Sequence, residues 1–210
     1  MGLAVHGDEV LVADGAGRRV EVFALDGTFR REFGNGRFGR AASGAAGALQ
    51  DPLGVVVGDG ETYVVDYGFD CVQVYDGEGR FVRRWGAQGS APGDFDNPAG
   101  IAWHGGSVFV TDRGRVQRFA ASGALQGEFR SLKLAGATGI AATADRVYVS
   151  GSVKGVGFVR VFTHAGAYLG EHAPPAYTRL GLVSSNGTHL LVTDELEHRV
   201  YGLAMGALGT

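Results

Sequence analysis

Apolar and polar residues follow one another in a pattern that recurs five times along this chain. Each repeat opens with a short apolar run that follows a glycine, at Gly2, Gly54, Gly100, Gly139 and Gly181. The glycines are spaced by roughly 40 to 50 residues, an interval typical of one supersecondary unit per repeat. The spacing therefore predicts a repeat protein in which every repeat folds in the same way.

A second run in each repeat is apolar throughout and ends in a small or acidic residue. These runs are 10–14, 62–66, 108–112, 147–151 and 190–194. A strand that is apolar on both faces is covered by protein on both sides. Each of these runs is therefore expected to lie between two layers of structure.

Two further segments complete the pattern. The third segment alternates apolar and polar residues, which places it nearer the rim of a sheet; its copies are 19–23, 71–75, 115–119, 158–162 and 199–203. After a turn with glycine comes a fourth segment that carries Arg and Glu, at 29–33, 81–85, 125–129 and 168–172. Charged side chains suit an exposed sheet edge, because they discourage pairing with other chains.

Four strands per repeat predict an all-β fold, a β-propeller of four-stranded antiparallel blades. The chain is expected to form one propeller domain over 1–210. Its repeats run approximately over 2–53, 54–99, 100–138, 139–180 and 181–210. The fifth repeat is expected to be incomplete, since only the opening of a fourth strand follows its third.

Several segments resemble the NHL-repeat propellers. The resemblance rests on 93–102, which reads Gly-Asp-Phe-Asp-Asn-Pro-Ala-Gly-Ile-Ala, and on the strands 108–112 and 115–119 that follow it. The segment 47–54 with 63–66 repeats the match, and the fourth repeat departs from it because Gly151 replaces the aspartate. Propellers of this family usually close with six blades. The resemblance therefore implies a partial propeller, whose exposed end sheets would favour self-association; a five-bladed ring is the alternative.

The net charge and the cysteine count make several classes of function less expected. The net charge is −3, which gives no overall attraction to nucleic acid or to an anionic membrane surface. Cys71 is the single cysteine, so neither an internal disulfide nor a zinc site built on paired cysteines is expected. We expect no signal peptide and no transmembrane segment in this chain, and its compartment stays unknown.

Two residue types suggest metals. Aspartate ends the second run four times, at Asp14, Asp66, Asp112 and Asp194. We expect each carboxylate to accept hydrogen bonds from the amides of the turn that follows, and a divalent cation on the axis is the alternative. A peptide-amidating lyase of the same family holds zinc with histidines. In this chain, the face that corresponds to the ligand face of that lyase would carry only His172 and His198. The other histidines are expected on the opposite face: His6, His104, His164 and His189.

No motif for catalysis stands out, since the chain has no Gly-x-Ser-x-Gly elbow and no phosphate-binding loop. The remaining candidates are basic and aromatic loop residues on the ligand face, where recognition is often located. The predicted partner-binding residues are Arg18, Arg37, Tyr67, Phe69, Arg113, Lys154 and His198. Their neighbours on the same face are Arg40, Asp70, Glu195 and Glu197.

The function predicted from these residues is a non-enzymatic scaffold that binds a protein or a small-molecule ligand through its loop face. It needs no cofactor. One alternative is a lyase or a lactonase-like hydrolase with an axial divalent metal, Ca²⁺ or Zn²⁺. A second alternative is single-stranded RNA binding through basic and aromatic loops, against which the acidic balance of the chain argues.

Overall fold

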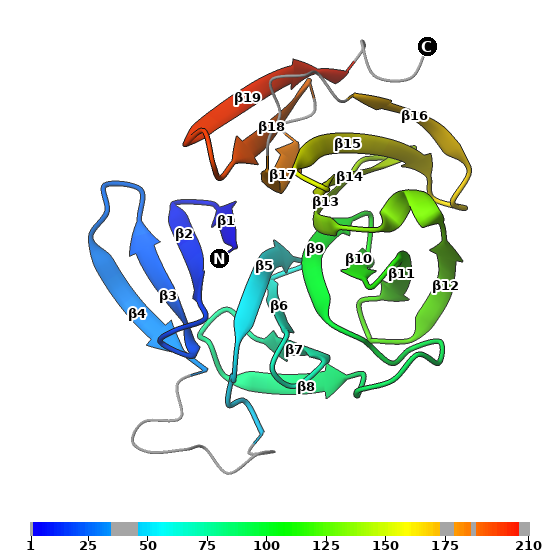
Figure 1. Ribbon diagram of the computed structural model, residues 1–210. Helices are drawn as coiled ribbons and strands as arrows, with labels where there is room; N and C mark the ends of the chain where they lie inside the picture. The colour runs from blue at the N-terminus through cyan, green and yellow to red at the C-terminus, as the bar shows by residue number, and fades with distance from the viewer. Residues whose placement is uncertain (1, 35–45, 173–178, 186–187, 206–210) are drawn as a thin grey trace. The chain divides into compact units, whose positions relative to one another are not determined.

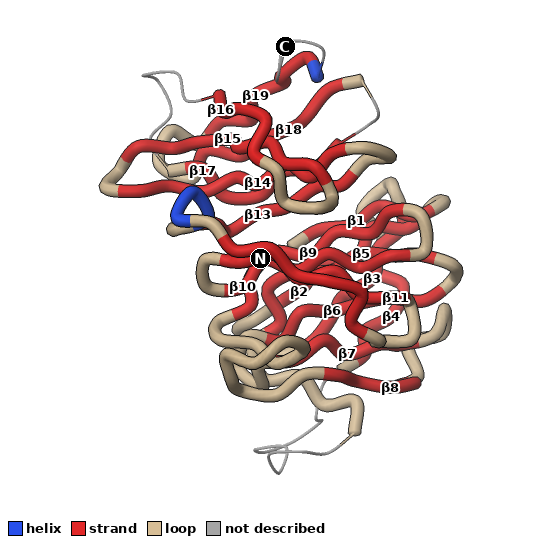
Figure 2. The backbone as a smooth tube through the Cα atoms, turned by 90° about the vertical axis from the view of Figure 1, so that its right-hand side faces the viewer, coloured by secondary structure: helices blue, strands red, loops and turns tan. Residues whose placement is uncertain are grey.

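The computed structural model describes residues 2–34, 46–172, 179–185 and 188–205. Strands and turns make up nearly all of this part of the chain, with the short 3₁₀ helix η1 (Leu132–Leu134) between two of the strands (Figure 2). The strands form five sheets, called sheets 1 to 5 in chain order (Figure 1). Within each sheet the strands lie in sequence order. The predicted all-β fold with antiparallel strands in every repeat is confirmed.

The strand bounds follow the predicted segments closely. Sheet 1 holds β1 (Leu3–His6), β2 (Glu9–Asp14), β3 (Arg19–Ala24) and β4 (Phe29–Phe33). Sheet 2 holds β5 (Pro52–Gly58), β6 (Glu61–Asp66), β7 (Cys71–Tyr75) and β8 (Phe81–Trp85). Sheet 3 holds β9 (Pro98–His104), β10 (Ser107–Asp112), β11 (Arg115–Ala120) and β12 (Leu125–Arg130). Sheet 4 holds β13 (Ala137–Ala142), β14 (Arg146–Val153), β15 (Val156–Thr163) and β16 (Tyr168–His172). Sheet 5 has three strands in the described residues, β17 (Leu180–Ser185), β18 (His189–Asp194) and β19 (Arg199–Ala204).

The chain divides into two compact units, Met1–Ile101 and Ala102–Thr210. In the first unit, sheets 1 and 2 pack face to face. Leu11, Val20 and Val22 of sheet 1 contact Val64 and Tyr75 of sheet 2 in one buried apolar cluster. The predicted covering of the second strand on both faces holds for β6, in which the five residues after Glu61 are buried. In β2 burial alternates instead, because only one face of sheet 1 is covered within this unit.

The second unit has two apolar clusters of the same kind. One joins sheet 3 to sheet 4 through Phe109, Val116, Val147 and Phe162, with Leu134 of η1 packed among them. The other joins sheet 4 to sheet 5, where residues of β14 and β15 meet Leu180, Val183, Leu190 and Val192. Repeats that each bury one face against the next explain why the apolar pattern recurs at a fixed interval.

Close packing between neighbouring sheets depends on one glycine in the turn between the third and fourth strands. In sheet 2 this residue is Gly79, with φ of 79°. A Cβ at Gly79 would lie 2.7 Å from the ring of Phe33, which ends the outer strand of sheet 1. Gly166 meets Phe129 in the same way in the second unit, at 2.3 Å. Any larger residue in these turns would push the two sheets apart.

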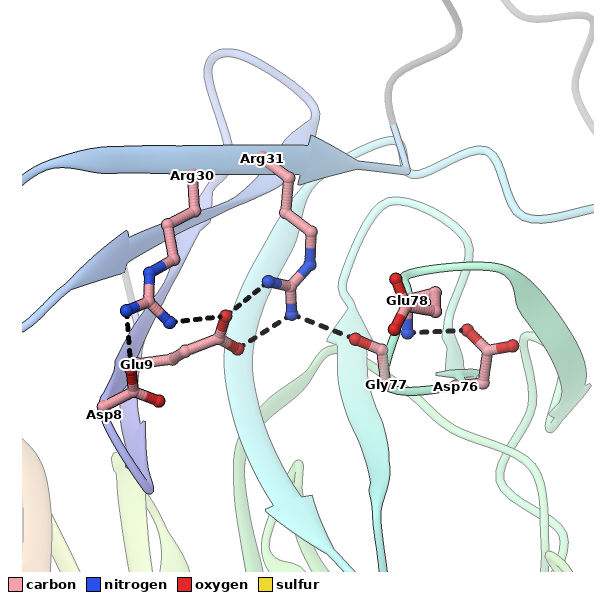
Figure 3. A network of polar contacts seen from close by, with 7 residues as sticks. All are labelled: Asp8, Glu9, Arg30, Arg31, Asp76, Gly77 and Glu78. Carbon is pink, nitrogen blue, oxygen red and sulfur yellow. Dashed lines mark hydrogen bonds and ion pairs between the residues drawn. The ribbon is translucent and has the colours of Figure 1, made fainter.

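The outer strands also carry the charged residues that the sequence predicted. Arg31 of β4 pairs with Glu9 and donates to the carbonyl of Gly77 in sheet 2 at 3.0 Å (Figure 3). Arg30 donates to Asp8 at 2.6 Å and to Glu9 at 3.2 Å. The hydrogen bond from Arg31 is the main cause that holds the pKa of Glu9 below its ordinary value. The rim of the first unit is therefore held by ion pairs over an apolar interior.

The fourth repeat departs from the others for a physical reason. A Cβ at Gly151 would lie 2.1 Å from the carbonyl oxygen of Gly136, so no aspartate fits at this position. Without a capping aspartate, β14 and β15 continue to a two-residue turn, Lys154 and Gly155, in which both residues have positive φ. This geometry is that of the tight hairpin turns that match the twist of the strands.

In the fifth repeat the predicted frame is wrong by one residue. Val183 pairs with Val192, as Val55 pairs with Val64 in sheet 2. Leu182 therefore lies at the place that Gly54 holds in the second repeat, and Gly181 comes one residue earlier.

No helix in the described part of the chain has the length and apolar character needed to cross a membrane.

Candidate functional site

The turn between the second and third strands of each sheet is the candidate binding element. We call these five connections the second-strand turns; they comprise 15–18, 67–70, 113–114, 154–155 and 195–198. The turn of sheet 2 is held by Asp66, which is fully buried. Its carboxylate accepts from the amides of Gln50 at 2.8 Å, Asp51 at 2.9 Å and Gly68 at 3.1 Å. One side chain thus ties the turn to the connection that leads into β5.

The same arrangement recurs at the other aspartates. Asp14 accepts from the amide of Gly17 at 2.8 Å. Asp194 accepts from Leu196 and Glu197 at 3.2 Å each. These hydrogen bonds confirm the predicted capping of the following turn for Asp14, Asp66 and Asp194. A capping carboxylate replaces water as the partner of these amides and so fixes the turn.

In sheet 3 the aspartate belongs to a buried charge cluster. Arg115 at the start of β11 donates through Nε to Asp112 at 2.6 Å and through Nη1 to Glu128 of β12 at 3.0 Å. The side chains of Arg115 and Asp112 are almost completely buried. In sheet 1, Arg19 joins Asp14 and Glu32 in the same way, with more exposure. Such clusters stabilise only when every partner is present, because a lone buried charge is costly.

Three of the predicted site residues have a left-handed backbone. Arg18 has φ of 56°, Lys154 of 51° and His198 of 51°. The turn of sheet 3 has Gly114 at this place, with φ of 81°. The left-handed region costs a residue with a Cβ about 1 kcal/mol or more, whereas glycine adopts it freely. In sheet 2 Asp70 holds this place, with φ of 48°. Charged side chains, most of them basic, therefore occupy positions at which glycine would fold more easily.

The structure places all described site residues on second-strand turns. Arg18, Tyr67 and Phe69 lie in the first unit, on the turns of the neighbouring sheets 1 and 2. Arg113, Lys154 and His198 lie in the second unit, on the turns of sheets 3, 4 and 5. Their side chains are exposed, except that Phe69 is half-buried. The candidate Arg37 and its neighbour Arg40 lie outside the described residues.

One charged residue that contacts these turns was not among the predicted site residues. Arg179 enters β17 and forms an ion pair with Glu195 of the second-strand turn at 3.1 Å. The negative charge of Glu195 is therefore partly neutralised. Arg179 could not be predicted from the repeat pattern, because it precedes the strand and belongs to none of the recurring segments.

The histidines do not converge. His104 and His164 lie near each other in the second unit, with ring centroids 6.5 Å apart, and Nε2 of His164 lies 2.9 Å from the carbonyl oxygen of Thr143. His198 lies on a second-strand turn. Across the described ranges, His, Cys, Asp and Glu side chains form no group of three that could hold a metal ion.

The thiol of Cys71 offers little reactivity. It is buried at the start of β7. Burial raises the pKa of this thiol to about 12, so that it stays protonated at neutral pH. A protonated thiol is a poor nucleophile and a poor metal ligand. Cys71 therefore behaves as a small apolar side chain of the core.

No family model and no curated protein matches the sequence. Solved structures resemble the fold. A streptogramin B lyase is 15% identical over 100% of this chain and 66% of its own, with a TM-score of 0.70. A nidogen/laminin complex is 15% identical over 98% of this chain and 76% of the other, with a TM-score of 0.71. A gluconolactonase from Xanthomonas campestris is 18% identical over 89% and 65%, with a TM-score of 0.63.

The chain spans slightly less than two thirds of the length of the lyase. At these identities the similarity concerns the fold alone. The sheets of this chain are blades, five of them in the described residues; closure with six blades, which the resemblance to NHL repeats implied, is not confirmed. The chain has the fold of a β-propeller.

Proposed function

We propose that this protein is a binding scaffold of the NHL-repeat type that recognises a protein or a small-molecule ligand through its second-strand turns. The observation that carries the proposal is the left-handed backbone of Arg18 and His198. Both side chains are exposed, and the backbone beneath them costs free energy that a glycine would not. Residues kept at such a cost contribute to something other than stability.

The turns also have the rigidity that recognition requires. Because Asp66 fixes the turn of sheet 2 from beneath, Tyr67 and Phe69 project from a backbone that needs little further ordering when a partner binds. Tyrosine and arginine contribute most to many protein interfaces. The nidogen/laminin complex, to which the fold is similar, is a complex between proteins.

Site-specific cross-linking tests the proposal. A photoreactive phenylalanine derivative at position 67 should capture the partner from an extract of the source cells. The matched control is position 168, since Tyr67 and Tyr168 are similarly exposed, at 41% and 39%, and Tyr168 lies on an outer strand. Capture at 168 and not at 67 would place binding elsewhere.

Two substitutions then measure the contribution of single side chains. Tyr67→Ala and Arg113→Glu should each weaken binding of the captured partner by at least about tenfold, the effect of one interface residue of moderate importance. Tyr168→Ala and Arg84→Glu on outer strands are the controls. Binding that survives both turn substitutions contradicts the proposal.

A second candidate is an enzyme of the lyase or lactonase type. The specific observation in its favour is the similarity of fold to a streptogramin B lyase and a gluconolactonase. It requires a divalent metal, Ca²⁺ or Zn²⁺, held by oxygen or nitrogen ligands. A streptogramin B and gluconolactone are suitable probe substrates, assayed with and without added metal. Turnover of either substrate that a chelator abolishes would favour the enzyme.

A further inference from the structure

One face of sheet 1 repeats, residue by residue, a face that is covered in sheet 2. We call the face of a sheet that packs against the preceding sheet its upstream face, and the opposite one its downstream face. The upstream face of sheet 2 consists of apolar residues that pack on sheet 1 in the first unit: Val55, Val57, Val64, Tyr75 and Phe81. Val55, for example, is only 3% exposed.

The matching positions of sheet 1 are apolar as well. The strand registers place them at Leu3, Val5, Val12, Phe23 and Phe29. Leu3 is 57% and Val5 is 61% exposed. Several large apolar side chains exposed together on a sheet are typical of an interaction surface. The upstream face of sheet 1 is therefore built like an internal face, and no sheet of the first unit covers it.

A glycine on the same sheet supports this interpretation. Gly79 of sheet 2 receives the ring of Phe33, the last residue of the outer strand of the preceding sheet. Gly27 occupies the corresponding turn of sheet 1, with φ of 87°, and a Cβ added there would meet nothing within 4 Å. The receiving position exists in sheet 1, and the structure leaves it open.

Sheet 5 carries the complementary face. In sheet 1, Leu11 and Val20 lie on the downstream face and are buried by sheet 2. Tyr148 and Val159 of sheet 4 correspond to them and are buried by sheet 5. The corresponding residues of sheet 5 are Leu191 and Val200, which are 46% and 64% exposed. The downstream face of sheet 5 thus has the positions of a covered face without the cover.

We infer that the downstream face of sheet 5 in one molecule docks on the upstream face of sheet 1 in a second copy of this chain. Each chain carries both halves of a contact that it already makes three times within its own units, between sheets 1 and 2, sheets 3 and 4, and sheets 4 and 5. Two different patches meet in such a contact, which makes it heterologous, so that association continues beyond a dimer unless a ring closes.

Sedimentation velocity and light scattering on the full chain test this directly. Between about 1 and 100 µM, a range that covers standard interfaces of modest affinity, the average mass should rise above the 21.9 kDa of one chain. Leu3→Glu and Val200→Glu each place a charge on one half of the contact, and each should weaken association at least about tenfold. Leu132→Glu is the control, because Leu132 is 98% exposed and lies on neither face.

Mixing the two variants distinguishes the contact between sheet 5 and sheet 1 from other interfaces between two copies of the chain. The Leu3→Glu chain keeps the sheet 5 half and the Val200→Glu chain keeps the sheet 1 half. Each variant alone should be monomeric, and the mixture should form a dimer of one chain of each kind and stop there. Circular dichroism checks that both variants are folded.

Two results would overturn the inference. A wild-type chain that stays monomeric over the whole range has its faces covered by other means, for example by its own fifth sheet or by a different protein. A wild-type oligomer that one of the two substitutions leaves intact, or a mixture that does not form the dimer, has a different interface.

Discussion

Removal of the Asp66 carboxylate is expected to be the most damaging single change among the turn aspartates. Asp66 is fully buried and accepts four hydrogen bonds, from the amides of Gln50, Asp51 and Gly68 and from Nε2 of Gln73 at 3.2 Å. In Asp66→Ala the three backbone amides lose this acceptor, whereas Nε2 of Gln73 keeps its hydrogen bond to the carbonyl of Ala48 at 2.7 Å. A buried donor without a partner costs about 1 to 3 kcal/mol.

The expected loss follows from these contacts. The three amide donors would together lower the free energy of unfolding by about 3 to 9 kcal/mol if water reached none of them. Because the space left by the side chain can admit water, we expect the lower part of that range, about 3 to 5 kcal/mol. Folded domains are stable by about 5 to 15 kcal/mol, so the loss should remove a large fraction of the free energy of unfolding.

Urea unfolding followed by tryptophan fluorescence provides the measurement. Asp14→Ala is the matched control, since Asp14 caps the equivalent turn of sheet 1 but is partly exposed. Its loss should cost about 1 kcal/mol, as for other exposed caps. Asp66→Asn keeps the volume but turns an amide group toward two of the donors, so it should also destabilise. Equal losses for Asp66→Ala and Asp14→Ala would refute the reasoning.

Three further predictions concern the core and the rim. The thiol of Cys71 should resist alkylation at pH 8 in the folded protein and react once urea unfolds it, because burial raises its pKa to about 12; rapid labelling of the native protein would be inconsistent with its position. Gly151→Asp, which restores the residue of the other repeats, should lower the midpoint of thermal unfolding, because its Cβ would collide with the carbonyl of Gly136; an unchanged midpoint would argue against this contact. The ion pair with Arg31 lowers the pKa of Glu9 in the folded state, so its stabilising effect is complete above the ordinary value of 4.5 and is lost as the pH falls through the lower folded value. The acid-induced loss of stability measured by urea unfolding should be smaller in Arg31→Met than in the wild type, and equal losses would show that the pair is unimportant.

The sequence predicted the parts of this fold that depend on short-range pattern. The strands were predicted from short apolar runs, and the third strand of each repeat from alternation of apolar and polar residues, because the face of a strand is read from every second residue. The capping role of Asp66 followed from its place at a strand end. Its further hydrogen bonds to Gln50 and Asp51 could not be predicted, since these residues lie in the connection before β5 and reach Asp66 only in the folded sheet.

Contacts between neighbouring sheets could not be predicted from the sequence either. Gly79 looks like any turn glycine in the sequence, and only the structure shows that it makes room for Phe33. The left-handed backbone of Arg18 also has no sequence signal, since glycine or asparagine is the usual mark of such a position. The sequence therefore predicted which loops hold the candidate site residues. The left-handed backbone, which supports their proposed role in binding, is seen only in the structure.

The central claim is that the second-strand turns hold exposed basic side chains for binding and not for stability. Titration of the cross-linked partner, once identified, against Arg18→Gly tests it most directly. Glycine suits the φ of 56° at this position, so the variant should fold as stably as the wild type. We predict that it binds the partner at least about tenfold more weakly. Unchanged affinity in a fully folded variant would contradict the claim.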